Sequence, residues 1–280
     1  MKNLLTLLLL TLTLHASTNE NFTYLQYDNY TFNNSKQKSD GARVTIHSKF
    51  SIDSKTLEVA YEKTNTKTYK PPLKSDLDVD KIYLKYQQKV FKTHKFHLGF
   101  ITLKDNIVPT DGGKVFSFGY LFPVHKDIFF DTNYYYGSYN IMNTQELDIS
   151  IHYKKAFGNL HTHIITQSKN IYIYDCNDQF CKNTDNAYNS AMLKIKLDYN
   201  EYLLHGAAFF GKRVFAVMMD GFLLQHHAME FSKTYMLGVG KRFDNFELKM
   251  KYAYQEAKEL PINNDNVEIN ALSLRMKYFY

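Results

Sequence analysis

The sequence contains no tryptophan and only two cysteines. One cysteine pair falls short of a cysteine-based zinc site, which needs a second pair or other ligands at suitable spacing. Beyond the amino-terminal segment, the sequence also lacks long hydrophobic runs. No stretch there approaches the roughly 20 consecutive apolar residues of a membrane-spanning helix. These absences exclude a helical membrane protein and give no support for a metal-binding role.

The first 17 residues have the composition of a secretory signal peptide. Lys2 is their only basic residue, an apolar run covers residues 4–14, and the small residues Ala16 and Ser17 follow. Such a segment is too short for a spanning helix and is removed after export. No cysteine lies at the expected cut, so a lipoprotein anchor is not indicated. We expect residues 1–17 to be the signal peptide and residues 18–280 the exported domain.

The two cysteines, Cys176 and Cys181, lie close together in a chain that is expected to be exported. A close pair in an oxidising compartment predicts a disulfide. Because the loop that it closes is small, the stabilisation should be modest and local. Two free thiols would instead favour a metal or redox role.

Charge and composition further narrow the classes of protein to which the chain can belong. The net charge is +6, but the basic residues are dispersed and the chain is exported, so we expect no nucleic-acid partner. The mean hydropathy is −0.41, although Tyr and Phe are abundant, with 23 and 21 copies. This combination is typical of membrane-spanning barrels, in which every second residue faces the lumen and aromatic side chains gather at the membrane interfaces.

From about residue 21 onward, alternating apolar and polar runs are separated by polar connections. Successive side chains of a strand point to opposite faces, so each run predicts an amphipathic strand. The clearest run places Leu147, Ile149 and Ile151 opposite Glu146 and Asp148. About fourteen strands are predicted, at residues 22–32, 41–50, 56–63, 80–87, 94–103, 114–122, 127–136, 145–155, 159–168, 187–199, 202–210, 231–243, 246–255 and 271–280. The facing of residues 22–32 and 202–210 stays open, because the first alternates poorly and the second is apolar on both faces.

The connections alternate between longer and shorter ones, which is the pattern of extracellular loops and periplasmic turns in outer-membrane barrels. The longer ones cover residues 33–40, 64–79, 104–113, 137–144, 169–186, 211–230 and 257–266. The sequence therefore predicts an all-β fold, a transmembrane antiparallel up-and-down β-barrel of about 14 strands with seven long extracellular loops. Twelve strands remain an alternative if the two unoriented runs are misassigned. Residues 64–79 and 211–230 are the connections that could fold partly inward.

The last ten residues carry a resemblance to a known family. Leu272, Leu274, Met276 and Tyr278 share one strand face, and the sequence ends on Tyr280. This resembles the terminal strand of Gram-negative outer-membrane β-barrels, which the barrel insertion machinery reads and which most often ends in Phe. In size and architecture the chain is similar to monomeric fourteen-stranded porins. The resemblance implies the cell outer membrane as location, and outer-membrane lipid, lipopolysaccharide and the insertion machinery as partners.

A polar lumen of this width predicts a channel for ions and small polar solutes. Basic residues outnumber acidic ones on the expected inner face, which predicts a weak preference for anionic solutes. The alternative is that opposite charges pair across strands and the excess has little effect. The predicted pore-lining residues are Arg43, Lys49, Lys81, Lys85, Glu146, Asp148, Lys154, Lys194, Lys196, Lys249, Lys251, Arg275 and Lys277.

Two other functions stay open at this point. The barrel could be structural or adhesive, with a blocked lumen and with Tyr172, Tyr174 and Phe180 in a partner-binding loop. It could also be a lipid-modifying enzyme, but no His after the signal peptide is followed two residues later by Ser, the spacing that outer-membrane phospholipases carry. We expect no enzyme activity and no cofactor. The histidines are expected to be polar lining or loop residues and not metal ligands: His152, His161, His163, His226 and His227.

Overall fold

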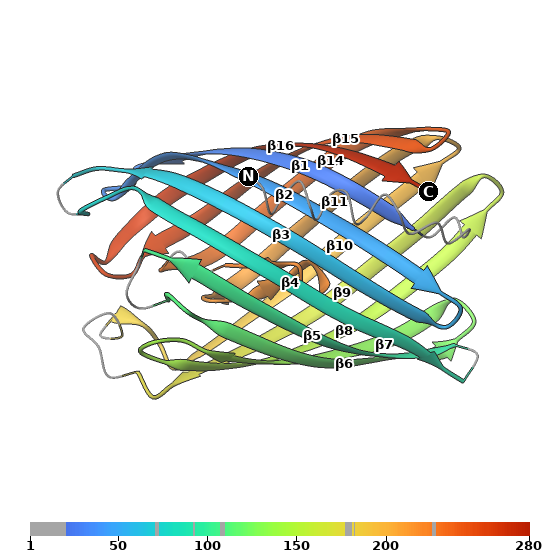
Figure 1. Ribbon diagram of the computed structural model, residues 1–280, viewed down its shortest axis with the longest axis horizontal. Helices are drawn as coiled ribbons and strands as arrows, with labels where there is room; N and C mark the ends of the chain where they lie inside the picture. Colours follow the sequence, from blue (N-terminus) through green and yellow to red (C-terminus); the bar gives the residue numbers. More distant parts are fainter. Residues whose placement is uncertain are drawn as a thin grey trace.

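The computed structural model describes residues 21–70, 73–91, 93–106, 110–176, 181, 183–225 and 228–280. Over these residues, fourteen antiparallel strands follow one another in sequence order and close into one barrel (Figure 1). The predicted fold class is confirmed, with fourteen strands and not twelve. The predicted signal peptide, residues 1–17, lies outside the described residues. No helix in the described ranges is long and apolar enough to cross a membrane.

All barrel strands except β10, which has the predicted bounds, are longer than predicted. They are β1 (Phe22–Asn33), β2 (Lys38–Ile52), β3 (Lys55–Thr68), β4 (Leu77–Val90), β5 (His94–Asp105), β6 (Lys114–His125), β7 (Ile128–Ser138), β8 (Asn143–Phe157), β9 (Leu160–Tyr174), β10 (Ala187–Tyr199), β11 (Tyr202–Arg213), β14 (Met229–Phe243), β15 (Phe246–Glu259) and β16 (Asn264–Phe279). Two further short strands, β12 (Val217–Met218) and β13 (Leu223–Leu224), pair only with each other. A 3₁₀ turn, η2 (Met219–Gly221), connects them.

The barrel closes where the first strand pairs with the last. The register of β1 and β16 runs from Phe22↔Phe279 to Asn33↔Glu268. Asp28 joins three strands at this seam, because its carboxylate accepts hydrogen bonds from Arg43 Nε on β2, at 2.8 Å, and from Ser273 Oγ on β16. Closure leaves no unpaired strand edge, which is what a sheet needs in order to sit in lipid.

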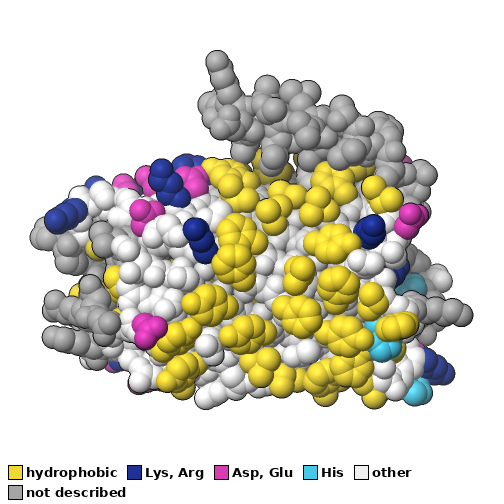
Figure 2. Space-filling model, turned by 60° about the horizontal axis from the view of Figure 1, so that its bottom comes forward, with side chains coloured by type: hydrophobic (Ala, Val, Ile, Leu, Met, Phe, Trp, Pro, Cys, Tyr) yellow, Lys and Arg dark blue, Asp and Glu magenta, His cyan; other side chains and the backbone are white. Residues whose placement is uncertain are grey.

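The outer face of the barrel is an apolar belt (Figure 2). The predicted outward residues Leu272, Leu274 and Met276 on β16 are each a little over half exposed. Their neighbours in the sequence, Ser273 and Arg275, point inward, where Ser273 is buried. Alternating exposure is also clear on β4 and β8, for example at Ile82 and Leu84 and at Leu147, Ile149 and Ile151, which agrees with the predicted facing. On β2, however, Val44 is exposed but Ile46, which shares its face, is only 8% exposed.

The two ends of the barrel differ in their connections (Figure 1). At the turn end, where the C-terminus lies, two or three residues join each pair of strands, as at Asp244 and Asn245. At the loop end, the strands continue past their predicted ends, so three of the seven connections have only four residues: 34–37, 139–142 and 260–263. Each strand was predicted to end where the alternation of apolar and polar residues ends. Hydrogen-bonded pairing continues further, as at Thr31↔Asn270, where the outward side chains are polar.

The structure also shows which side chains point inward on β1 and β11, the strands for which the sequence did not predict the inner face. On β1, Tyr24 and Phe32 point inward, while Leu25 and Tyr27 are exposed on the belt. Both faces therefore carry aromatic or apolar residues, which is why the alternation was weak. On β11, Leu203 and Phe209 are buried inside the barrel and Leu204 and Phe210 are exposed outside. Near Phe209 the inner face of β11 is apolar because Phe209 and Ala207 pack in the apolar cluster that fills this end of the lumen.

Candidate functional site

The lumen is filled at the loop end by the connection between β11 and β14. Residues 214–224 fold back into the barrel as the hairpin β12–η2–β13, which we call the lumen hairpin. Its residues Val214, Ala216 and Val217 are at most 3 % exposed. They pack in one apolar cluster with inward side chains of the wall such as Tyr83 and Ile171. The expectation that residues 211–230 could fold partly inward is confirmed.

Buried charges on β8 and β9 hold the first strand of the lumen hairpin. Lys169 Nζ donates 2.7 Å to the carbonyl oxygen of Val217, and Val217 N donates 2.8 Å to Glu146 Oε2. The same ammonium is paired with Asp148, at 2.7 Å, and with Glu146. Lys169, Glu146 and Asp148 are each at most 3 % exposed. Such a cluster is stable only because every charge in it has a partner.

A second set of contacts, on β3 and β4, holds the returning strand of the lumen hairpin. Lys81 Nζ donates 3.1 Å to the carbonyl oxygen of Leu224 and is paired with Glu62 at 2.6 Å. Lys85 Nζ donates 2.8 Å to the backbone oxygen of Asp220. The hairpin is therefore fixed to two different parts of the wall by hydrogen bonds from buried lysines.

The tip of the lumen hairpin has an unusual backbone. Met219, Asp220 and Gly221 have φ values of 53°, 57° and 97°, in the left-handed region that non-glycine residues rarely adopt. Phe222 anchors this turn against the wall, with its ring centroid 4.4 Å from that of His47 and with Lys85 Nζ 5.7 Å from its centroid. The contacts thus hold Asp220 at a defined position inside the lumen, where its side chain is exposed.

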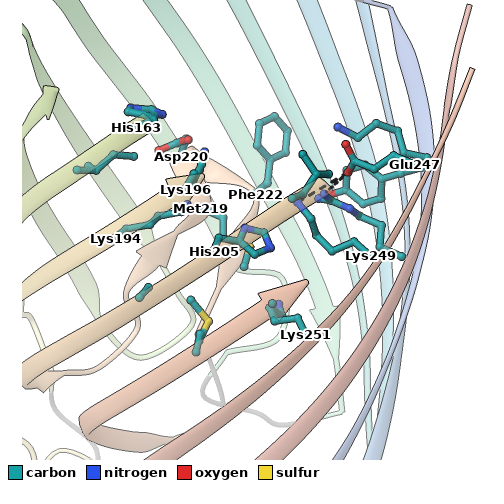
Figure 3. Close-up of a pocket in the computed structure, with 18 of the residues that line it drawn as sticks. His163, Lys194, Lys196, His205, Met219, Asp220, Phe222, Glu247, Lys249 and Lys251 are labelled. Atoms are coloured by element: carbon teal, nitrogen blue, oxygen red, sulfur yellow. Dashed lines mark hydrogen bonds and ion pairs between the residues drawn. The ribbon is translucent and has the colours of Figure 1, made fainter. Parts of the chain in front are cut away.

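Below the hairpin tip, towards the turn end, the lumen is a charged cavity of about 590 Å³ (Figure 3). Nine basic and five acidic side chains line it, an excess of four positive charges. The basic residues are Lys85, Lys154, Lys194, Lys196, Arg242, Lys249, Lys251, Arg275 and Lys277. The acidic residues are Glu58, Asp131, Asp198, Asp220 and Glu247.

One carboxylate neutralises part of this wall. Glu247 pairs with Arg275 at 2.9 Å, with Arg242 at 3.6 Å and with Lys249 at 3.8 Å. Other lysines of the wall have no such partner: among the described residues, no carboxylate oxygen lies within 4.0 Å of Lys194, Lys196 or Lys251. Cross-strand pairing therefore removes only part of the positive charge.

The lumen favours the ionised form of Asp220. Although its side chain opens onto the cavity, the surrounding barrel limits its hydration and so raises the pKa of its carboxyl; the ammonium groups of Lys85, Lys194 and Lys196 lower it more, so the pKa lies well below its ordinary value. Lys85 comes from β4, and the other two come from β10. These strands are six positions apart one way round the barrel and eight the other way. Asp220 thus interacts with charges from nearly opposite walls.

All of the predicted pore-lining residues lie on the inner face of the barrel, but their surroundings differ. Eight of them line the cavity: Lys85, Lys154, Lys194, Lys196, Lys249, Lys251, Arg275 and Lys277. Lys81, Glu146 and Asp148 are buried in the contacts that hold the lumen hairpin. Arg43 lies at the barrel seam between Asp28 and Glu62, and Lys49 lies over the ring of Phe22. A role in lining a conduction path stays a prediction for each of them.

Several histidines of the lumen form small hydrogen-bonded groups, although Nε2 of His205 has no hydrogen-bond partner among the described residues. His47 bridges the Tyr24 hydroxyl and Glu58, both at 3.0 Å, and His152 Nδ1 lies 3.2 Å from His163 Nε2. In the described ranges, no three His, Cys, Asp or Glu side chains are grouped so that they could hold a metal ion. His226 and His227 lie outside the described residues.

The disulfide between Cys176 and Cys181 is present, with the two Cα atoms 5.9 Å apart, as the sequence predicted. Both cysteines pack against the apolar cluster around the lumen hairpin. The prediction that Tyr172 and Tyr174 lie in a loop is wrong, because β9 continues to Tyr174 and pairs with β10 at Tyr172↔Ala187. Phe180 lies outside the described residues.

Sequence reasoning missed the residues of the hairpin tip as part of the site: Met219, Asp220 and Phe222 line the cavity. The available signal was the unbroken apolar run of residues 214–219 in a connection that was expected to be able to fold partly inward, although the residues that do so were not named. A run of that kind has to be buried, and the nearest apolar surface that excludes water is the inside of the barrel.

No protein-family profile and no curated protein sequence matches the chain. Its fold is similar to that of solved outer-membrane channels. The "CymD monoaromatic hydrocarbon channel" has 8% identity and a TM-score of 0.59, with 94% of this chain and 90% of that chain covered. The Ralstonia pickettii toluene transporter TbuX has 7% identity and a TM-score of 0.57 over the same shares. The Acinetobacter baumannii outer membrane protein Omp33 has 8% identity and a TM-score of 0.51, with 94% and 100% covered. At these identities the likeness shows the outer-membrane β-barrel fold.

Proposed function

We propose that the chain is an outer-membrane channel for ions and small polar solutes, with a weak preference for anions. The observation that carries this proposal is the charged cavity, whose lining has nine basic and five acidic side chains. A wall with excess positive charge raises the local concentration of anions and lowers their barrier relative to cations. Because the cavity is polar and open to water, the preference should be small and should fade as the salt concentration rises.

The fold supports the proposed location. The apolar belt would contact outer-membrane lipid and lipopolysaccharide, with the turn end in the periplasm and the loop end outside. The last strand, with Met276, Tyr278 and Tyr280 on one face, would be the segment that the insertion machinery reads. The hydrocarbon cargo in the names of the similar channels does not fit this cavity, because an apolar solute would have to displace water from lysine side chains.

A second candidate function, a barrel with a blocked lumen, is favoured by one observation. The lumen hairpin packs the loop end with side chains such as Val214 and Ala216, which have no exposed surface. In this arrangement, a solute that crosses the barrel has to pass the hairpin. If the hairpin never moves, the barrel would serve as a structural or binding protein.

Recordings in a planar bilayer separate the two candidates. The wild-type protein is compared with a variant in which a Gly-Ser linker of equal length replaces residues 214–225. We expect a small conductance from the wild type, a several-fold larger one from the variant, and a zero-current potential of anion-preferring sign under a KCl gradient. If only the variant conducts, the blocked barrel is correct. If neither conducts, or if both prefer cations at low salt, the channel proposal or its anion preference is wrong.

A further inference from the structure

Four of the positive charges of the cavity lie on two neighbouring stretches of its wall, to the left and to the right in Figure 3. Lys194 and Lys196 come from β10, and Lys249 and Lys251 come from β15, two strands that are separated by β11 and β14. Three strand spacings correspond to roughly 14 Å of wall, and the long lysine side chains shorten the gap between the two sets of ammonium groups. A ligand of a few carbon atoms can therefore contact both walls.

Lys249 is paired with Glu247, but the other three ammonium groups on these walls have no such close partner among the described residues. Lys194, Lys196 and Lys251 have no hydrogen bond, ion pair or ring contact within the described part of the chain. Each is only half-exposed, so part of the surrounding water that would stabilise its charge has been removed. Like charges at this density repel one another unless an anion lies between them.

The fold supplies one such anion from the lumen hairpin. Asp220 lines the same cavity, and its carboxylate interacts electrostatically with Lys194 and Lys196. The left-handed backbone of Met219 and Asp220 costs conformational energy, and the Lys85 contact to the Asp220 backbone oxygen keeps the turn in place. The hairpin therefore holds a single negative charge against a wall that could accept several.

We propose that this cavity binds a compact organic anion with two or more carboxylate or phosphate groups, and that Asp220 is a tethered competitor for the β10 lysines. A multivalent anion contacts several ammonium groups at once, so its second and third contacts form at high effective concentration. A monovalent anion lacks this advantage and is screened by salt. Binding of such an anion is a property separate from conduction and can be measured without it, so the inference goes beyond the proposed channel function.

The test is isothermal titration calorimetry of the folded full-length protein in detergent at low salt. The probes are citrate for the carboxylate class and pyrophosphate for the phosphate class, with acetate and NaCl of equal ionic strength as monovalent controls. We expect saturable binding of at least one multivalent probe and none of acetate. The probe with the larger affinity identifies the anionic group that the cavity prefers.

Three variants locate the site. The double substitution Lys194→Gln and Lys196→Gln should weaken binding at least tenfold, and Asp220→Asn should strengthen it several-fold because the competing charge is gone. The matched control is Lys233→Gln, which removes an exposed lysine paired with Glu256 on the outer face, and it should leave the affinity unchanged. Retention of the folded barrel is checked by the mobility difference between unheated and heated samples on a gel.

Several results would overturn the inference. The cavity is not a binding site if neither multivalent probe binds, or if NaCl reproduces the heat signal of the probes. The same conclusion follows if the double variant binds a probe with wild-type affinity. Unchanged or weaker binding by Asp220→Asn would show that Asp220 does not compete. If the wild type binds neither probe but conducts anions, this inference is wrong and the proposed channel stands. If it binds a probe but does not conduct, the channel proposal is wrong and this inference stands.

Discussion

At the scale of single residues, buried lysines decide how the lumen is filled. Lys169 and Lys81 are each 2 % exposed, and each combines a carboxylate partner with a backbone carbonyl of the lumen hairpin. The backbone of the hairpin would otherwise carry unsatisfied polar groups in a dry environment, which is costly. The charges on the wall thus act as hydrogen-bonding partners for an inserted segment.

Replacing Lys169 with methionine tests this role. The substitution nearly keeps the side-chain length but removes the ammonium group that Glu146, Asp148 and the Val217 carbonyl share. Breaking a buried ion pair by removing one partner costs about 3–5 kcal/mol. We expect the hairpin to detach from β8 and β9 while the barrel stays closed. Limited proteolysis of the folded protein, read by mass spectrometry, should then show cleavage within residues 214–225.

The matched control is Lys233→Met, which removes an exposed lysine that pairs with Glu256 at 2.9 Å. Exposed pairs contribute about 0–1 kcal/mol, so cleavage should stay at the wild-type level. Equal cleavage of wild type and Lys169→Met would show that the ammonium does not hold the hairpin.

The alternation of apolar and polar residues predicted the inward and outward sets because lipid contact on one face leaves a clear period of two. It could not predict which inward charges meet water. Lys81 and Lys194 look alike in the sequence, yet Lys81 is buried against Leu224 and Lys194 lines the open cavity. That difference depends on where residues 214–224 insert, which is a tertiary event.

At the scale of elements, the inward or outward direction of the side chains can be tested on each strand separately. On β15, Met250 lies between Leu248 and Tyr252 on the apolar belt and is 52% exposed, whereas its neighbour Lys251 lines the cavity. Lysine at the bilayer midplane of a barrel costs about 2–4 kcal/mol. Met250→Lys should therefore lower the free energy of unfolding in lipid vesicles by that amount, as measured by urea titration.

The adjacent substitution, Lys251→Met, is the control for the strand itself. It exchanges the same two residue types in the opposite direction on the inner face. Because Lys251 has no ion pair within the described part of the chain to lose, the free energy of unfolding should shift by about 0.5 kcal/mol or less. Similar losses in both variants would mean that the β15 facing does not follow the belt.

Strand ends and the inserted hairpin were the elements that the sequence predicted least well. Polar residues such as Asn264 and Asn270 extend β16 beyond the belt, because backbone pairing with β15 and β1 does not require apolar side chains. The strands β12 and β13 have two residues each, too few for any periodicity. Only the apolar composition of their connection indicated burial.

At the scale of the whole molecule, the barrel has two unlike halves. The loop-end half is packed by an apolar cluster that includes Val214, Leu224 and Leu260, and the turn-end half holds the charged cavity. On some strands the inner face therefore changes from apolar to charged along its length, whereas on β8 it is charged at the packed end too, where Glu146 and Asp148 hold the hairpin. On β4, for example, Val79 and Tyr83 lie at the packed end and Lys85 lines the cavity. This division follows from the inserted hairpin and could not be predicted from the strand pattern.

The last prediction concerns how the whole barrel sits in the membrane. Outer-membrane barrels keep short turns in the periplasm and longer loops outside, so the packed half should face outward and the cavity should face the periplasm. Epitope tags inserted at Asn183 or Asn263, both at the loop end, should be labelled by antibody on intact cells. Tags at Asp53 or Asn245, both in two-residue turns, should be labelled only after the outer membrane is permeabilised. Labelling in the reverse order would place the cavity on the cell surface, where anions would reach it from outside without passing the lumen hairpin.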